Sequence, residues 1–345
     1  MKELRTGYTT GSAMTAAAVA AYRDISGEVA IRLPGGGSLA VPVARRWPGG
    51  AAVVKDGGDD PDVTHGCEVV AELTRSGEDA ADFAEPCGEA GVLLIRGGAG
   101  VGRVTRPGLA VPPGRPAINP GPRRMLAENL ELAGFGATPE RLTVTVSVPG
   151  GEELAKQTLN PALGVVGGIS ILGRSGIVRP YSNEAYAETI RLQLGSLAAC
   201  GGRAAALATG NRTTEALRRD CPEFPADAVI PIADFIHVAI RAAADAKLER
   251  LVVGCMPGKL FKYACGQENT HARRNKQELS RLAEFGVELP GVSTMGEVAA
   301  RLEPGTYRAL LDRLYGKALN TLQQWAGADL RIELALYDNE GGRIR

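Results

Sequence analysis

The frequency of glycine limits what this chain can fold into more than any other feature of its sequence. Glycine accounts for 45 of the 345 residues, nearly twice its usual share of about 7%. Since glycine weakens helix and strand interiors but allows left-handed backbone, we expect many tight turns and close backbone approaches. The length suits about two domains, and 44% hydrophobic with 23% charged residues is an ordinary globular composition.

The first part of the chain alternates short apolar runs with glycine turns. Residues 28–33 and 38–44 flank Pro34-Gly35-Gly36-Gly37, and this arrangement predicts a β-hairpin. Hydroxyl and glycine residues before an alanine run predict a helix that begins near Ser12. Further strands are expected at residues 51–55, 67–74 and 92–96. This half is therefore predicted to be mixed α+β.

After about residue 139 the pattern changes to repeated strand, glycine turn and helix, which predicts a largely parallel sheet covered by helices. We place the domain change between residues 138 and 139. Strands are expected at 142–148, 169–172, 203–208, 228–232, 250–253 and 330–337, and helices at 183–199, 233–246, 270–285 and 306–325.

Four glycine-containing turns follow these strands, at residues 149–151, 173–176, 209–211 and 254–259. In an open parallel sheet such turns gather at the carboxyl edge, where ligands bind. They could therefore form a cofactor pocket, or they could be only short connections. The usual nucleotide motifs are absent, because Arg103 replaces the third glycine of one motif and Val253 the first glycine of the other.

The stretch from Lys55 to Gly66 contains four aspartates and a histidine. Crowded carboxylates raise each other's pKa and need a cation, a basic neighbour or full solvation. The spacing does not match an EF-hand. A hard-metal site, a carboxylate base, a polar substrate site and a solvated loop all remain open.

Arginines dominate the next segment. Residues 90–127 contain six arginines and no acid, whereas residues 56–89 contain eleven acids and one base apart from histidine, Arg75. An arginine-rich glycine loop suits a ligand with several carboxylates or phosphates. The arginines could equally neutralise the acidic segment. The total of 39 basic and 39 acidic residues argues against a nucleic-acid or anionic-membrane surface.

Six cysteines without a Cys-x-x-Cys pair favour reduced thiols and a cytoplasmic protein. No run of 18 apolar residues predicts a membrane span. His237 lies among apolar residues and is expected to pack in a helix, whereas His271 could orient an anionic ligand at a helix N-terminus or simply cap it.

Five stretches of the chain carry a resemblance to a known family: Leu4–Ala13, Lys55–Gly66, Gly97–Arg123, Asn160–Pro180 and Gly258–His271. Together they resemble the CbiD family, the cobalt-precorrin-5B C(1)-methyltransferases of the anaerobic cobalamin pathway. The family combines a mixed α/β first domain with a Rossmann-like second domain. The resemblance implies a mixed α+β domain over residues 1–138 with corrinoid-binding loops. It also implies a Rossmann-like domain with a largely parallel sheet over residues 139–345, which binds S-adenosylmethionine.

The resemblance implies methylation of C-1 of cobalt-precorrin-5B by S-adenosyl-L-methionine, giving cobalt-precorrin-6A. The methyl donor supplies the reactivity, and the protein holds carbon, methyl group and sulfur in line. Cobalt enters only as part of the substrate, and no metal site is assigned. Two alternatives stay open: a divalent-metal hydrolase that uses Asp56–His65, and a non-catalytic corrinoid-binding protein.

The resemblance also suggests three sets of site residues. Near the reacting ring edge, where one side chain would handle a released proton, we expect Asp59, Asp60, Asp62 and His65. For substrate binding, with the arginines on acetate and propionate groups, we expect Thr9, Thr10, Ser12, Lys55, Arg103, Arg106, Arg115, Asn119, Arg123 and His271. For the methyl donor we expect Gly167, Gly168, Ser170, Gly173, Thr209, Gly210 and Asn211.

Three positions depart from the family pattern and leave the fine detail of the pocket open. Thr213 stands where the family tends to carry glycine, His237 lies in a helix that tends to contain a glycine, and Ala272 replaces a serine. The sequence also leaves open the catalytic base, the use of a cobalt-free substrate and the oligomeric state, including a homo-oligomer.

Overall fold

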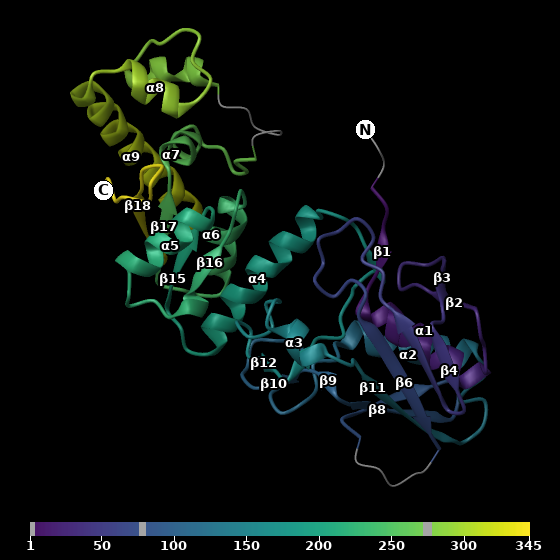
Figure 1. The fold of residues 1–345 in the computed structure, drawn as a ribbon. Helices are drawn as coiled ribbons and strands as arrows, with labels where there is room; N and C mark the ends of the chain where they lie inside the picture. The colour runs from purple at the N-terminus through teal and green to yellow at the C-terminus, as the bar shows by residue number, and fades with distance from the viewer. Residues whose placement is uncertain (1–3, 76–80, 272–277) are drawn as a thin grey trace. The chain divides into compact units, whose positions relative to one another are not determined.

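The structure is a computed structural model that describes residues 4–75, 81–271 and 278–345. The chain forms two compact units, unit 1 (Met1–Ser182) and unit 2 (Asn183–Arg345), which can be followed by colour in Figure 1. Both units mix helices and strands, so the expected α/β character is confirmed. Across the described residues, no helix is long and apolar enough to span a membrane.

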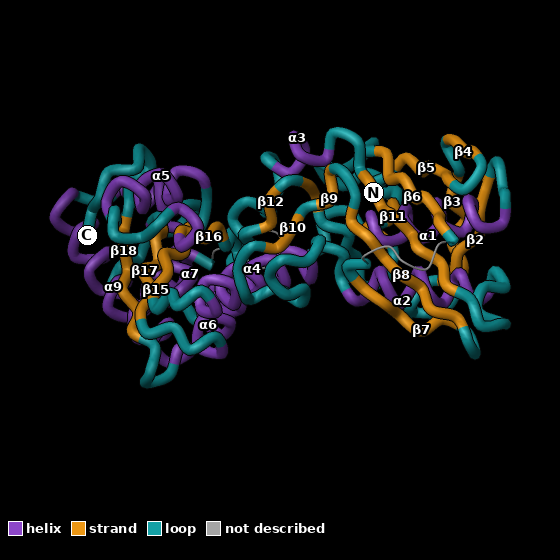
Figure 2. Tube along the Cα trace, turned by 90° about the horizontal axis from the view of Figure 1, so that it is seen from below, coloured by secondary structure: helices purple, strands orange, loops and turns teal. Residues whose placement is uncertain are grey.

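Unit 1 is built on a six-stranded sheet with the order β4-β5-β6-β11-β8-β7. Neighbours in this sheet pair antiparallel, except that β11 and β8 are parallel. Figure 2 shows the central strands side by side. The strands expected at 51–55, 67–74 and 92–96 are confirmed as β5, β6 and β8. The bounds are β4 (Arg45–Trp47), β5 (Gly50–Val54), β6 (Glu68–Thr74), β7 (Phe83–Cys87), β8 (Gly91–Gly97) and β11 (Arg141–Ser147).

The alanine-rich helix α1 (Thr10–Arg23) packs on this sheet. Its N-cap is Thr9, whose hydroxyl accepts a hydrogen bond from the Ser12 N–H at 3.2 Å. All residues from Thr10 to Ala20 are buried, and their small side chains let the helix contact β5, β6 and helix α2 (Pro120–Leu132). The helix expected near Ser12 is thereby confirmed.

The division of the chain differs from the boundary expected between residues 138 and 139. Strand β11 follows that boundary, yet it pairs with β6 and β8 of the first sheet, and the two units divide after Ser182. The strand expected at 169–172 is the short β13 (Gly168–Ile169), which pairs with β9 (Gly100–Val101) of unit 1. A local alternation of strands and helices does not reveal which sheet each strand joins.

Short strand pairs complete unit 1. The expected hairpin is confirmed as β2 (Glu28–Arg32) and β3 (Ser38–Pro42). Within the arginine-rich segment at residues 90–127, the structure forms β9 and β10 (Arg103–Val104), and β10 pairs with β12 (Val165–Val166). Other short elements are β1 (Gly7–Tyr8), which pairs with β14 (Ile177–Val178), and helix α3 (Gly151–Ala155).

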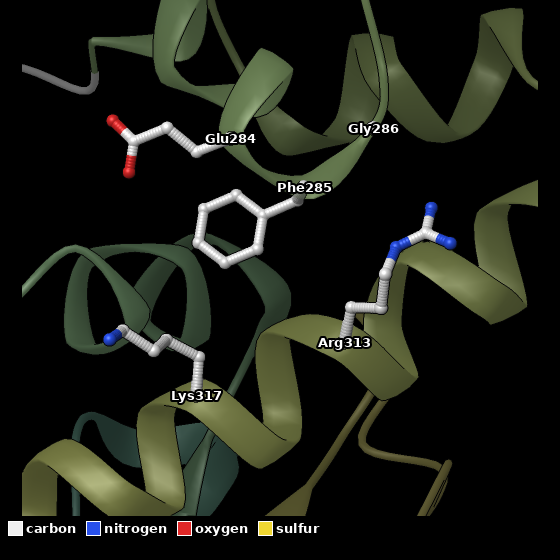
Figure 3. A pocket seen from close by; sticks show the side chains of 5 residues that line it. All are labelled: Glu284, Phe285, Gly286, Arg313 and Lys317. Atoms are coloured by element: carbon white, nitrogen blue, oxygen red, sulfur yellow. The ribbon is translucent and has the colours of Figure 1, made fainter.

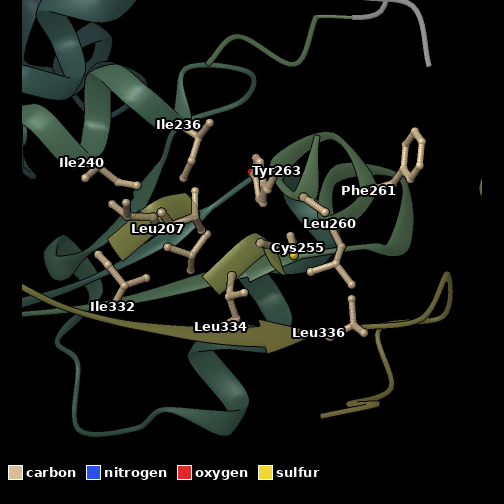
Figure 4. Packing of buried hydrophobic residues seen from close by; sticks show 14 of the residues in the cluster. Leu207, Ile236, Ile240, Cys255, Leu260, Phe261, Tyr263, Ile332, Leu334 and Leu336 are labelled. Atoms are coloured by element: carbon tan, nitrogen blue, oxygen red, sulfur yellow. The ribbon is translucent and has the colours of Figure 1, made fainter. Parts of the chain in front are cut away.

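Unit 2 contains a parallel sheet with the order β16-β15-β17-β18, so the strand order reverses between β15 and β17. One face, which carries Leu207 and Leu334, packs against α4, α6, α7 and α9. Figure 4 shows this face with side chains of α6 and α7. The other face packs against α5. The elements are α4 (Asn183–Ala199), β15 (Ala204–Ala208), α5 (Asn211–Asp220), η1 (Ala226–Ala228), β16 (Val229–Pro231), α6 (Ile236–Asp245), β17 (Arg250–Cys255), α7 (Pro257–Ala264), α9 (Pro304–Ala326) and β18 (Arg331–Leu336).

The helix expected over residues 270–285 is not formed in the described part of that range. Thr270 and His271 lie in a loop, residues 272–277 fall outside the described residues, and Leu279–Phe285 form the 3-10 helix η2. The segment is followed by the short helix α8 (Met295–Arg301). The Thr270 N–H donates to the Asp234 carbonyl at 3.1 Å, outside any helix.

The N-terminal strap, which we define as residues 5–9, crosses the acidic loop, residues 55–66, with the two backbones in direct contact. A Cβ atom on Gly7 would lie 2.2 Å from the Asp56 carbonyl oxygen, and one on Gly58 would lie 2.3 Å from the Arg5 carbonyl oxygen. The Tyr8 N–H donates to the Asp56 carbonyl at 2.8 Å, and the Asp59 N–H donates to the Arg5 carbonyl at 2.9 Å. Glycine is therefore required at the crossing.

Replacing Gly58 by alanine should destabilise the protein more than replacing Gly66. Both residues have positive φ angles, 66° and 80°, but within the described part of the chain the Cβ position of Gly66 has only its two chain neighbours inside 4 Å. We expect Gly66→Ala to cost about 1 kcal/mol through backbone strain alone. Gly58→Ala should cost about 3 kcal/mol, since steric overlap adds to that strain. Urea unfolding of both variants measures the difference, and equal losses would contradict the crossing.

Candidate functional site

In the acidic loop, the Lys55–Asp62 ion pair is the most buried charge interaction. The Lys55 side chain is only 3% exposed, and its Nζ donates to Asp62 Oδ2. The other carboxylate oxygen of Asp62 accepts hydrogen bonds from the Thr64 N–H at 2.8 Å and from the Thr64 hydroxyl at 2.6 Å. Burial by itself would raise the pKa of Asp62, but the hydrogen bonds and the charge of Lys55 outweigh it and lower that pKa.

Asp56 and His65 lie close together in the same loop, with Asp56 Oδ1 3.6 Å from His65 Nδ1. The Arg5 guanidinium donates two hydrogen bonds to the Asp56 carboxylate and lowers its pKa. His65 Nδ1 accepts the Gly57 N–H at 2.9 Å, which selects the neutral tautomer with the proton on Nε2. The His65 side chain is 53% exposed, so this ring is accessible to a ligand.

Asp59 and Asp60 fasten the loop to neighbouring segments. Asp59 Oδ2 accepts the Arg5 N–H at 2.8 Å, and Asp60 Oδ1 accepts the Tyr181 N–H at 2.9 Å. Each of the loop's four aspartates therefore has a basic or N–H partner within unit 1. Among the described residues, no three His, Cys, Asp or Glu side chains gather as a metal-binding group.

The three hydroxyl residues expected to bind substrate contact the protein itself. Thr10 Oγ1 donates to the carbonyls of Ser170 and Leu172 at 3.1 and 3.3 Å, and Ser12 Oγ donates to the Gly176 carbonyl at 2.7 Å. Thr9 is the cap of α1, and all three are buried. In this structure these hydroxyls join the start of α1 to residues 170–176.

The arginine loop, which we define as residues 97–123, contacts acidic residues that precede it in the sequence. Arg103 lies 3.6 Å from Asp82 and also donates to the Gly114 carbonyl. Arg115 donates to the Asp82 carbonyl at 2.8 Å. Arg103 is half exposed, and its strand partner Val166 is 52% exposed. Directly paired strand residues share one face, so these two residues form an accessible cationic and apolar surface.

Arg123 and Arg106 are held more firmly within unit 1. Arg123 Nη1 pairs with Glu85 at 2.6 Å, and its guanidinium carbon lies 4.1 Å from the centre of the Phe83 ring. The Arg123 side chain is 16% exposed. Arg106 donates to the Ala162 carbonyl and packs over Gly164.

Four of the residues expected at the methyl donor lie in unit 1. A Cβ atom on Gly168 would lie 2.2 Å from the Gly100 carbonyl oxygen, and one on Gly173 would lie 2.3 Å from Thr9 Oγ1. Ser170 Oγ donates to the buried Asn160 side chain at 3.0 Å. Gly167 has open space around its Cβ position. Asn119 precedes α2, and its N–H donates to the Ile171 carbonyl at 3.0 Å.

Two of the four glycine turns lie at the carboxyl edge of the unit 2 sheet. These are the turns after β15 and β17, and Thr209 Oγ1 joins them by donating to the Gly254 carbonyl at 3.1 Å. The turns at 149–151 and 173–176 belong to unit 1, so the expectation that all four share one edge was wrong. Gly210 and Asn211 are exposed at the start of α5.

Thr213, one of the three departures from the family pattern, stabilises the turn after β15 at this edge of the sheet. Its hydroxyl accepts the Gly210 N–H at 2.9 Å, which satisfies a donor at the start of α5. Of the other two, His237 packs edge to face on Trp325 with ring centres 5.2 Å apart, as its apolar neighbours predict. Ala272 lies outside the described residues.

A polar cluster at the same edge was missed by sequence reasoning. Lys259 Nζ donates to Asp234 Oδ1 and to Thr270 Oγ1, the latter at 2.6 Å. Thr270 Oγ1 donates to Asp234 at 2.9 Å, and the buried Lys262 donates to the Thr270 carbonyl at 2.5 Å. Asp234 and Lys259 follow the predicted strands at 228–232 and 250–253, and that position was the available signal.

The remaining candidates contribute less to a site. The exposed His271 has its N–H on the Asn269 side chain at 3.0 Å. Burial raises the pKa of Cys67 and Cys87 to about 11 and that of Cys255 to about 12. These three thiols are therefore poor nucleophiles at neutral pH.

A pocket of about 550 Å³ lies elsewhere in unit 2 (Figure 3). The pocket is lined by residues of η2, the residue that follows η2 and residues of α9: Glu284, Phe285, Gly286, Arg313 and Lys317. None of these residues belongs to a loop that follows a strand of the sheet. Glu284 already pairs with Arg281 at 2.7 Å. The converging polar groups at the sheet edge are the stronger candidate for a ligand site.

Comparison with known proteins extends across both units. The sequence profile of the CbiD family matches residues 1–180. A cobalt-precorrin-5B C(1)-methyltransferase of Nitratidesulfovibrio vulgaris is 39% identical, with 99% of this chain and 92% of that protein covered. A protein of the same name from Geobacter sulfurreducens is 41% identical, with 86% and 84% covered.

A crystal structure of the cobalamin biosynthesis protein CbiD from Archaeoglobus fulgidus is also similar. It shares 23% identity with a TM-score of 0.42, and the match covers 96% of this chain and 86% of that one. The two methyltransferases match 99% and 86% of this chain, at 39% and 41% identity. This chain therefore belongs to the CbiD family.

Proposed function

We propose that this chain methylates C-1 of cobalt-precorrin-5B with S-adenosyl-L-methionine and so produces cobalt-precorrin-6A in cobalamin biosynthesis. One observation carries the proposal: a methyltransferase of that name is 39% identical over 99% of this chain. The match includes both the arginine loop of unit 1 and the sheet edge of unit 2. Conservation of one reaction across such a full-length relationship is the simplest account.

The donor supplies an electrophilic methyl group: the ring carbon forms the new bond, and the sulfur keeps the electron pair of the bond that breaks. The protein needs no covalent nucleophile for this displacement. Its task is to hold the reacting atoms in line and to exclude competing water. Such positioning is worth about 7–11 kcal/mol in well-oriented systems.

We assign the methyl donor to the carboxyl edge of the unit 2 sheet, and from the strand order β16-β15-β17-β18 we infer a Rossmann-like domain. Ligands of open parallel sheets bind where the strand order reverses, which is between β15 and β17 here. Thr209, Gly210 and Asn211 lie at that position. Apart from its two chain neighbours, no described residue comes within 4 Å of the Cβ position of Gly210, so a ligand can approach the backbone.

We assign the corrinoid to the arginine loop of unit 1. Arg103 and Arg115 are exposed, and their contacts are mainly with carbonyl oxygens, which a substrate carboxylate can replace. Val166 supplies an apolar contact for the macrocycle beside Arg103. Arg106 and Arg123 support the loop from within the unit.

We assign proton handling to the exposed members of the acidic loop, His65 and Asp59. The Gly57 N–H occupies Nδ1 of the His65 ring, so the Nε2–H group donates to an oxygen or carboxylate of the substrate, and the Asp59 carboxylate is the group that accepts a released proton. Asp62 is committed to Lys55 and is a supporting residue. Asp60 supports the loop through the Tyr181 N–H.

Anaerobic incubation with cobalt-precorrin-5B and methyl-labelled donor tests the reaction directly. Mass analysis should show transfer of one labelled methyl group to the corrinoid. Tight corrinoid binding without transfer would contradict the proposed reaction.

Arg103→Ala should raise the KM for cobalt-precorrin-5B by about tenfold, because one charge-assisted contact is worth about 1.5 kcal/mol or more. The kcat should change little, since this contact is remote from the reacting carbon. Arg124→Ala is the matched control, because Arg124 is an exposed arginine of α2. Steady-state kinetics of both variants decides, and an unchanged KM for Arg103→Ala would refute the assignment.

His65→Gln should lower the single-turnover rate by about 100-fold at saturating substrate, the low end for loss of a proton-transfer group. Val63→Ala, at an exposed position of the same loop, should leave the rate unchanged. Rapid-quench measurements separate this step from product release. A full rate in His65→Gln would exclude the proton-handling role.

Asp62→Asn should destabilise the protein by about 3 kcal/mol at pH 7, because it leaves the buried Lys55 charge without its partner. The folded-state pKa of Asp62 is lowered. The ionised Asp62 carboxylate therefore stabilises the folded protein above the ordinary carboxyl pKa of about 3.9, and this contribution is lost as the pH falls through the folded-state pKa. Wild type and variant should converge in acid.

Urea titrations between pH 3 and pH 7 measure this convergence. The exposed Asp59→Asn variant serves as the control, since an asparagine oxygen can still accept the Arg5 N–H. A constant difference across the pH range would contradict the ion-pair account.

A further inference from the structure

The position of Asp234 in the unit 2 sheet resembles that of a ribose-binding acid. The chain runs from β15 through α5 to β16, and Asp234 follows β16, the second strand of the sheet. Asp234 comes 24 residues after Gly210 in the first glycine turn. In doubly wound sheets, an acidic residue about 20 residues beyond that turn accepts hydrogen bonds from ribose hydroxyls.

The backbone before Asp234 is held in an unusual conformation. Ala233 has a φ of 46°, which lies in the left-handed region that residues with a Cβ rarely adopt. Strain of this kind persists only where the surroundings impose it, and it clusters at ligand sites. The Thr270 N–H donates to the Asp234 carbonyl at 3.1 Å and helps to hold this turn.

The contacts of the Asp234 side chain leave part of it available. The hydrogen bonds that it accepts from the described residues, from Lys259 and Thr270, both go to Oδ1. Its side chain is 23% exposed. Burial alone would raise the pKa of Asp234, but Lys259 and Thr270 lower it, so the group stays an ionised acceptor at neutral pH.

We propose that the Asp234 carboxylate binds the ribose hydroxyls of the nucleoside methyl donor, and that Lys259 and Thr270 are positioning residues for that carboxylate. The hydroxyls are donors that match the second oxygen, Oδ2, while the ion pair with Lys259 keeps Oδ1 in place. This inference rests on the proposed function, because it requires a nucleoside-containing donor. Asp234 thereby becomes a hydrogen-bond acceptor in the same donor site as the glycine turn at 209–211.

Calorimetry with two ligands and matched variants of the full-length chain tests the inference. The ligands are S-adenosylhomocysteine and its 2′,3′-dideoxyribose analogue, which lacks both hydroxyls. We expect Asp234→Asn to weaken binding of S-adenosylhomocysteine by about 30-fold or more and to leave binding of the analogue unchanged. Asp245→Asn, at the exposed end of α6, should change neither affinity.

Lys259→Gln provides a second variant that keeps the carboxylate but removes its ion pair. We expect Lys259→Gln to weaken binding of S-adenosylhomocysteine by a smaller factor than Asp234→Asn does, and to leave binding of the analogue unchanged. Lys259→Arg, which keeps the positive charge, should retain part of the lost affinity. Thermal unfolding of each variant checks that unit 2 remains folded.

Three results would overturn the inference. Equal losses for both ligands would make Asp234 a structural residue, and unchanged affinities would remove it from the site. Either result leaves the methyltransferase activity in place. If wild type binds neither ligand and transfers no methyl group, both the inference and the proposed function fail.

Discussion

The close crossing of the N-terminal strap and the acidic loop is the constraint on which the site region of unit 1 depends. Gly7 and Gly58 bring two backbones into contact, and the hydrogen bonds across the crossing fix the start of α1. Thr10 and Ser12 then join that helix to residues 170–176. The two hydrogen bonds at the crossing itself join main-chain atoms, so side chains elsewhere in the loop can be replaced while the crossing persists.

Charge compensation explains why a neutral chain contains two strongly charged segments. Part of the acidic segment pairs with arginines of the next one, through Asp82 with Arg103 and Glu85 with Arg123. The arginine loop therefore both stabilises unit 1 and presents exposed guanidinium groups. A carboxylate-rich macrocycle fits such a surface, since its acids can take over contacts now made by carbonyl oxygens.

In unit 2 the parallel sheet brings distant polar residues together. Strand order places the ends of β15, β16 and β17 at one edge, where Thr209 contacts Gly254 and Lys259 pairs with Asp234. Burial raises the pKa of the Cys255 thiol at the end of β17 to about 12, so this thiol is a poor nucleophile at neutral pH. The reaction that we propose needs orientation of a reactive donor and no protein nucleophile.

Periodicity, caps and motifs are local signals, and they were enough to predict the hairpin, α1, the parallel sheet of unit 2 and the family. The sequence also located the glycine turns and the aspartates, but it did not reveal the residues that contact them. Three outcomes appear only in the folded chain: β11 joins the first sheet, Lys55 pairs with Asp62, and Lys259 and Thr270 meet Asp234. Those outcomes depend on strand pairing and burial between segments far apart in the chain, which local patterns do not encode.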